Sequence, residues 1–219
     1  MKQHPMPFRP HEVCATISGA KTQKRVLVKF PPDFDGETVY QNGGDGVKYG
    51  VCNGFDTVNR IYPRWHVGDF IWVKETFYAF GWWEKNGWSK TNRQKWRFVY
   101  NPTYHYMYSD NVGHIEKTRG VGWHKRPSLF MPREAARIFL WVTAIGSEQL
   151  HDITEADAIA EGVEKWEDGN FKAYGKCAGK YRHARDSYLS LFESLSSKEV
   201  VASNPWVTVI TFQKLEKPC

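Results

Sequence analysis

Three cations and a hydroxyl fall within five residues at Lys21, Thr22, Lys24 and Arg25. They follow Gly19, and a glycine near the end of a helix adopts the left-handed conformation cheaply and turns the chain. The spacing therefore predicts that these side chains are presented at a helix-to-strand corner, which could hold a phosphate or a polar base edge. A solvated basic turn is the alternative interpretation, because short basic motifs match by chance.

A strand expected over residues 66–80 carries a further candidate, Glu75. Apolar side chains alternate along this strand, which places Glu75 on the same face as Ile71 and Val73, and Lys74 on the other face. If the Ile71 face is buried, the Glu75 carboxylate needs a partner. A strand-end salt bridge is the alternative interpretation. Lys74 and Glu75 are therefore candidate ligand-binding residues.

Glu161 lies at the end of a short expected helix. Thr154 and Asp157 have the spacing of a capping box, and Gly162 ends the helix. An acid in the last turn opposes the helix dipole, so local physics disfavours Glu161 at this position. A residue in a locally poor position is a hint of function. A solvated glutamate is the alternative, since the dipole penalty is small at an exposed site.

Charge is segregated along the chain. Residues 81–140 contain eleven Lys or Arg against four Asp or Glu, whereas residues 141–200 contain seven against eleven. The basic segment also contains the tryptophans Trp82, Trp83, Trp88, Trp96 and Trp123. Cations attract phosphates and interleaved aromatic rings stack on bases, so this segment indicates nucleic-acid contact. Alternatively, the tryptophans belong to a core or to a protein interface.

The bulk composition indicates one globular domain, 1–219, with insertions at about 31–64 and 81–126. The four cysteines form no CxxC pair and the histidines form no HxxxH motif, so no metal site, cofactor or disulfide framework is predicted. No apolar run approaches the roughly 20 residues of a membrane span. The first residues lack the apolar core of a signal peptide. We therefore expect no membrane partner and a cytoplasmic protein.

Periodicity predicts an α+β fold built on a small curled sheet or barrel. Helices are expected over 11–20, 154–162 and 181–196, and strands over 26–30, 66–80, 138–145 and 206–215. Residues 131–137 are expected to form a single helical turn. Residues 31–64 are expected to be loops with little regular structure, and 81–128 an irregular insertion or lid in which 96–100 has strand character.

Five segments together carry a resemblance to a known family. They are Gly19–Arg25, Val67–Glu75, Arg126–Arg133, Ile153–Val163 and Asn204–Val207. In this order and rough spacing the chain resembles an ASCH-domain protein, of the longer kind found in phages and prophages. The resemblance covers most of the chain apart from 31–64 and 81–122.

The resemblance implies a PUA-like β-barrel with flanking helices. Domains of this superfamily commonly bind RNA or modified bases. Some small ASCH proteins are amidohydrolases that remove the acetyl group from N4-acetylcytidine, and a ribonuclease activity is also attributed to the family. In the amidohydrolases a lysine and a threonine of a GRKTxT-like motif act with a glutamate. Lys21 falls on that lysine and Glu161 on that glutamate.

The chain departs from the family pattern at the threonine, because that position is Lys24. A nucleophile needs a hydroxyl or a thiol and a nearby base, and Lys24 supplies neither hydroxyl nor thiol. Thr22 lies two residues away and could replace the threonine only if the backbone moved. Alternatively, a neutral lysine acts as a base on a water molecule.

Three hypotheses follow for the function. The first is a module that binds RNA, single-stranded nucleic acid or a modified nucleoside. The residues lining its cleft would be Lys21, Lys24, Arg25, Glu75 and Glu161. The bound nucleic-acid strand would be contacted by residues such as Lys74, Trp123, Lys125, Arg126 and Arg133. The second is a hydrolase acting on an N4-acylated cytidine-like nucleoside, or else a ribonuclease. The third is a protein-interaction domain with the tryptophans as its interface.

Overall fold

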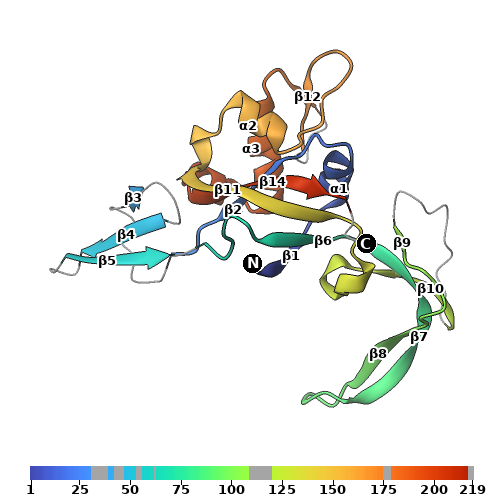
Figure 1. Ribbon diagram of the computed structural model, residues 1–219. Helices are drawn as coiled ribbons and strands as arrows, with labels where there is room; N and C mark the ends of the chain where they lie inside the picture. Colours follow the sequence, from blue (N-terminus) through green and yellow to red (C-terminus); the bar gives the residue numbers. More distant parts are fainter. Residues whose placement is uncertain are drawn as a thin grey trace. The chain divides into compact units, whose positions relative to one another are not determined.

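The computed structural model describes residues 1–30, 39–41, 47–52, 56–61, 63–108, 120–174 and 179–216 (Figure 1). The chain divides into two compact units. The first consists of residues 1–4, 14–71 and 138–219, and the second of residues 5–13 and 72–137. The units are described separately below.

A five-stranded sheet has the order β1-β6-β11-β14-β2, and its strands β2, β11 and β14 lie wholly in the first unit. The strands are β1 (Gln3–Pro7), β2 (Gln23–Leu27), β6 (Phe70–Lys74), β11 (Phe139–Gln149) and β14 (Trp206–Leu215). β14 pairs antiparallel with both β11 and β2, so the last strand of the described chain lies beside one of the first. Its buried residues Val207, Ile210 and Phe212 place it at the centre of the core.

Helices cover one side of strands β11 and β14, as Figure 1 shows for α2 and α3. The helices and small strands of this part are α1 (Pro10–Ile17), η3 (Leu150–Asp152), α2 (Glu155–Ala160), β12 (Phe171–Lys172), β13 (Lys180–Tyr181), α3 (Ala184–Leu195) and α4 (Lys198–Ala202). Tyr188, Leu191 and Phe192 of α3 pack with Ala158 of α2 and Val207 of β14 in one buried cluster. This packing presses α2, and the residues that follow it, against the sheet.

Asp69 fixes the chain beside β1. It is buried, and its carboxylate accepts hydrogen bonds from the backbone N–H groups of Lys2 (2.7 Å) and His66 (3.1 Å). The Nε2 atom of His4 lies 3.1 Å from the same carboxylate. Burial alone raises the pKa of Asp69, but these hydrogen bonds outweigh burial and hold the pKa below its ordinary value.

The second unit contains a separate antiparallel sheet in the order β10-β7-β8, with β9 also paired to β7. Its elements are β7 (Phe77–Trp88), β8 (Gln94–Tyr100), β9 (Met107–Tyr108), β10 (Gly122–Arg126), η1 (Ser128–Phe130) and η2 (Arg133–Ala135). β7 and β8 form a long hairpin. Gly81 lies where a Cβ atom would be 2.0 Å from the carbonyl oxygen of Val99, so only glycine fits this close approach of the two strands.

The α+β prediction is confirmed, and the expected strands 138–145 and 206–215 match β11 and β14. Closure into a barrel is not seen among the described strands, where β1 and β2 are the two edges of an open sheet. The expectation of loops over 31–64 is wrong in part, since β3 (Val39–Gln41), β4 (Val47–Cys52) and β5 (Asp56–Ile61) form a three-stranded sheet. The irregular insertion expected over 81–128 is also wrong in its described part, which is mostly sheet.

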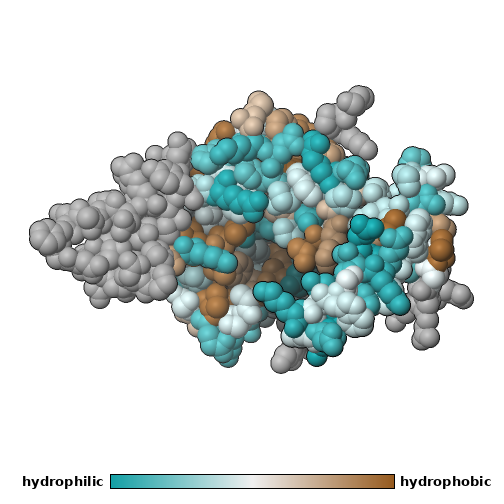
Figure 2. Space-filling model, turned by 90° about the horizontal axis from the view of Figure 1, so that it is seen from below, coloured by the Kyte–Doolittle hydropathy of each residue, from teal (hydrophilic) through white to brown (hydrophobic). Residues whose placement is uncertain are grey.

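No helix in the described ranges is long and apolar enough to cross a membrane. Figure 2 shows one face of the molecule, on which hydrophobic side chains (brown) are interspersed with hydrophilic ones (teal).

Candidate functional site

The first unit contains a buried charge cluster around Lys21. Gly19, at φ +82°, ends α1 in the left-handed conformation, and the backbone N–H of Lys21 donates to the carbonyl of Ala15 (2.9 Å). α2 is capped by Thr154, whose hydroxyl accepts from the N–H of Asp157 as the capping spacing predicted. α2 therefore ends with Glu161 directed at Lys21.

Lys21 and Glu161 form a direct ion pair. The Nζ atom of Lys21 lies 2.7 Å from Oε2 of Glu161 and also donates to the Glu161 carbonyl at 2.7 Å. The two side chains are 1% and 4% exposed. Because this pair is shielded from water, removal of the Glu161 carboxylate would leave the Lys21 ammonium buried without that counter-charge.

Arg25 completes the cluster. Its Nη1 donates to Oε1 of Glu161 (3.3 Å) and to the Gln23 side chain (3.1 Å), and its Nε donates to Glu148 (2.7 Å). Nη2 lies 3.8 Å from the Asp157 carboxylate and has no hydrogen-bond partner among the described residues. Burial disfavours the cation, but the charges of Glu161 and Glu148 outweigh burial and raise the pKa of Arg25.

A glycine makes the close contact between Lys21 and Glu161 possible. Gly162 has φ +81°, and a Cβ atom there would lie 2.8 Å from Cβ of Ala15 and 2.9 Å from Cβ of Lys21. Both distances are shorter than side chains tolerate. The glycine predicted to end the helix therefore also lets Lys21 cross the chain just after Glu161.

The sequence predicted Lys24 and Thr22 beside Lys21, but neither side chain joins the cluster. β2 begins at Gln23, three residues earlier than the predicted strand, so Lys24 and Arg25 lie on the strand and not at a corner. Neighbouring residues of a strand point to opposite faces, which places Lys24 on the face opposite Arg25. Thr22 is exposed, and its backbone bonds to Ala160 and Phe212.

Glu75 has its partner within the second unit. It is buried, and its two carboxylate oxygens accept from Nε and Nη2 of Arg137 at 2.8 and 2.9 Å. The guanidinium of Arg137 lies 4.1 Å from the centre of the Tyr108 ring. Glu75 is thus buried and partnered, and because it directly follows β6 its contact with Arg137 is also the strand-end salt bridge of the alternative interpretation. Arg137 was not predicted, although a buried acid calls for a cation and this one stands just before β11.

The other predicted binding residues also lie in the second unit. Lys74 donates to the carbonyl of Leu129, and burial lowers its pKa. Trp123 is half-buried against Phe80. Lys125 on β10 and Arg133 in η2 are exposed, whereas Arg126 is buried. Two of these cations, Lys125 and Arg133, are thus exposed to solvent, whereas Arg126 is shielded from it.

The hairpin β7–β8 has an exposed aromatic and basic face. Trp83 and Trp96 are 41% and 53% exposed. Lys85 is directly opposite Trp96 and Trp83 directly opposite Phe98, so all four side chains share a face. Trp88, at the end of β7, is 64% exposed.

The acidic residue of the hairpin, Glu84, lies on the face opposite Trp83. Residues 83–97 contain five Lys or Arg and a single acid, Glu84. Glu84 is opposite Arg97 across the hairpin and pairs with it at 3.2 Å, while it also accepts from the indole N–H of Trp82 at 2.9 Å. The Trp83 face thus carries no carboxylate from this segment.

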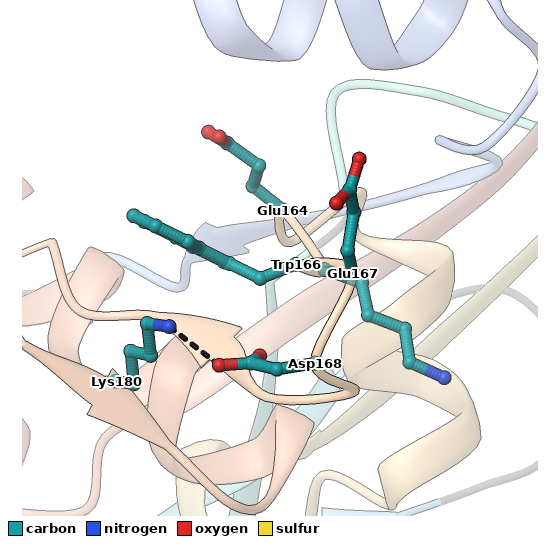
Figure 3. Close-up of a pocket in the computed structure, with 6 residues that line it drawn as sticks. Glu164, Trp166, Glu167, Asp168 and Lys180 are labelled. Carbon is teal, nitrogen blue, oxygen red and sulfur yellow. Dashed lines mark hydrogen bonds and ion pairs between the residues drawn. The ribbon is translucent and has the colours of Figure 1, made fainter.

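A pocket of about 490 Å³ lies beside β12 and contains none of the predicted site residues (Figure 3). It is lined by Glu164, Lys165, Trp166, Glu167, Asp168 and Lys180. Figure 3 shows the Lys180 ammonium pairing with Asp168, and Lys180 also lies 4.5 Å from the centre of the Trp166 ring. Its lining mixes three acids with two lysines, and Lys180 is already paired with Asp168, so the pocket specifies no ligand.

No group of three or more metal-ligating side chains occurs among the described residues. Of the cysteines, Cys14 is a free, exposed thiol. Comparison with family models, with curated proteins and with solved structures finds no match for this chain.

Proposed function

We propose that this chain binds single-stranded nucleic acid through the hairpin β7–β8. The observation that carries the proposal is the segregation of the hairpin into two faces. One face exposes Trp83 and Trp96 beside Lys85, and the only acid of residues 83–97 is paired on the other face.

The physical basis is stacking combined with charge. Bases of a single strand stack on exposed aromatic rings at about 1–3 kcal/mol each, with little dependence on sequence. Trp83 and Trp96 are diagonal neighbours across the hairpin, a separation of about 7–8 Å between backbones that aromatic side chains span. Lys85 lies between them on the same face and can neutralise a phosphate. A duplex hides its base faces, so the single strand is the ligand that this surface fits.

The resemblance to ASCH-domain proteins agrees with this proposal, because domains of that superfamily commonly bind RNA. We include in the proposal that the fold is of the ASCH type, a finer assignment than α+β. The basic segment that the resemblance does not cover then supplies the grip on the strand.

The test is fluorescence anisotropy with labelled single-stranded oligonucleotides, dT and rU of equal length, over a series of salt concentrations. The double variant Trp83→Ala/Trp96→Ala removes the two exposed rings of this face, and Trp166→Ala removes a comparably exposed ring of the first unit, 44% exposed. We expect the hairpin variant to lose at least tenfold in affinity and Trp166→Ala to bind as the unmodified chain does. Equal affinities for all three proteins, or an affinity that does not fall with salt, would overturn the proposal.

A second candidate function is hydrolysis of an N4-acylated cytidine-like nucleoside. The observation favouring it is the buried pair of Lys21 and Glu161, at 2.7 Å, on the two positions that the resemblance assigns to catalysis. In this reaction water adds to the acyl carbon, the carbon–nitrogen bond breaks, and the leaving N4 nitrogen takes a proton. Glu161 would carry the proton to the leaving nitrogen, and a water molecule would be the nucleophile.

This second candidate is tested by incubation with N4-acetylcytidine and detection of cytidine and acetate. Turnover that disappears in both Lys21→Ala and Glu161→Gln but persists in Lys24→Met would support it, since Lys24 lies on the opposite face of β2. Absence of turnover in the unmodified chain, or full turnover in Glu161→Gln, would exclude this role for the pair. Cleavage of the rU oligonucleotide in the binding experiment would instead indicate that the chain has ribonuclease activity.

A further inference from the structure

Arg126 on β10 is enclosed by aromatic rings. Its guanidinium carbon lies 4.8 Å from the ring centre of Trp83, 4.5 Å from that of Phe98 and 5.1 Å from that of Phe130. The residue is 6% exposed. His124, two residues earlier on the same face of β10, packs edge-on against Phe98. All of these residues belong to the second unit.

Arg126 differs from the other buried cations in lacking an acid. Lys21 and Arg25 are buried to a similar degree, and each has a carboxylate within 3.3 Å. For Arg126 no ion pair or hydrogen bond is found in the described ranges, and its buried Nε has no acceptor. Aromatic faces attract a guanidinium, but they offer no acceptor to its five N–H donors.

A buried guanidinium whose Nε–H has no acceptor is energetically poor unless an anion completes it. We propose that Arg126 is an oxyanion-binding residue that takes a phosphodiester group of the strand bound by the hairpin. This inference rests on the proposed function and adds a specific phosphate subsite to it. Trp83 links the two, because one face of its ring covers Arg126 while the side chain remains 41% exposed for a base.

The phosphate can reach Arg126 with little rearrangement. Phe130, one of the covering rings, is 54% exposed and belongs to the short helix η1. Rotation of this ring uncovers the guanidinium without breaking a backbone hydrogen bond. A planar guanidinium then binds two phosphate oxygens in parallel, which a lysine ammonium does not do.

The test compares Arg126→Met and Arg126→Lys with Arg97→Met, in the same anisotropy assay with single-stranded dT over a salt series. Arg97 is the matched control, because it lies on the opposite face of the hairpin and pairs with Glu84. We expect Arg126→Met to lose about tenfold in affinity, the value of one charge-assisted hydrogen bond. Its slope of log K against log salt should fall by about 0.7, the value of one phosphate contact.

The charge-retaining variant separates a phosphate contact from simple packing. Arg126→Lys should weaken binding several-fold with the salt slope unchanged. If Arg126 only supports Trp83, both variants will lower affinity and neither will change the slope, which would overturn the inference. If Arg126→Met and Arg97→Met bind the oligonucleotide equally well, the inferred phosphate subsite is overturned and the proposed function remains intact.

A measurement on the unmodified chain covers the case in which Arg126→Met does not fold or the oligonucleotide does not bind. The Nε–Hε signal of Arg126, identified by its absence in Arg126→Lys, is followed by ¹⁵N NMR during addition of inorganic phosphate at constant ionic strength. A saturable shift of this signal, and not of the Arg97 signal, supports an oxyanion site even if the proposed function has failed. No shift, or an equal shift of both signals, overturns it.

Discussion

Removing the Glu161 carboxylate should destabilise the first unit strongly. In Glu161→Gln the Lys21 ammonium, whose side chain is 1% exposed, keeps two neutral oxygen acceptors but loses its carboxylate at 2.7 Å. Breaking a buried ion pair by removing one partner costs about 3–5 kcal/mol. Because the amide oxygen can still accept from Lys21, we expect about 3 kcal/mol.

The reverse change should cost less. In Lys21→Met the Glu161 carboxylate keeps the Arg25 guanidinium at 3.3 Å, so it is not left without a cation. We expect a loss of about 2 kcal/mol. Removing both charges together leaves no unpaired ammonium, so the double variant should be more stable than the sum of the single losses predicts. A coupling of about 1–3 kcal/mol is the range found for residues in contact.

The assay is urea denaturation at pH 7, with the slope m checked for each variant so that a changed unfolded state is recognised. Lys172→Met is the control, since its pair with Glu164 at 2.7 Å is 39% and 53% exposed and should contribute less than about 1 kcal/mol. Strict additivity of the two single losses, or a Glu161→Gln loss no larger than that of Lys172→Met, would refute the account of a shielded, mutually dependent pair.

Three further changes test other parts of the structure. Gly162→Ala should cost about 2–3 kcal/mol in urea denaturation, because the new Cβ would lie 2.9 Å from Lys21 at a positive φ. The depressed pKa of Asp69 contributes stability that is present above the unfolded pKa of about 3.9 and lost as pH falls through the folded value. Asp69→Asn should therefore lower stability at pH 7 and flatten its fall below about pH 4, as followed by circular dichroism. Arg137→Gln should lower the melting temperature more than Glu75→Gln, because it removes the cation beside the Glu75 carboxylate, whose side chain is 3% exposed, whereas Glu75→Gln leaves the charge of Arg137, which is 21% exposed.

Local patterns predicted most of what lies within single elements. The alternation of residues 66–80 placed Glu75 on the face of Ile71 and Val73, and since that face is buried the carboxylate needs a partner, which is Arg137. The capping spacing of Thr154 and Asp157 and the stop at Gly162 predicted α2 closely. In each case a short-range rule about backbone geometry or burial determines the outcome.

Positions that depend on strand register could not be predicted in this way. A start of β2 only three residues earlier than expected moves Lys24 to the face opposite Arg25. Glu148, which binds Arg25, comes from β11, and nothing near it in the sequence indicates that β11 and β2 lie on either side of β14. Similarly, the two strands on either side of the turn between Trp88 and Gln94 lack the regular apolar alternation that would have indicated a hairpin.

The pairing of β2 with β14 has a consequence for the order of folding during synthesis. Leu27 is opposite Val207, which leaves the ribosome 180 residues later. At about 5–20 residues per second, β2 waits roughly 10–40 s for its only neighbour in the described sheet. Glu161 follows Lys21 by 140 residues, so for most of that interval Lys21 and Arg25 also lack the Glu161 carboxylate. The native charge cluster is thus a late event, set by the chain's own connectivity.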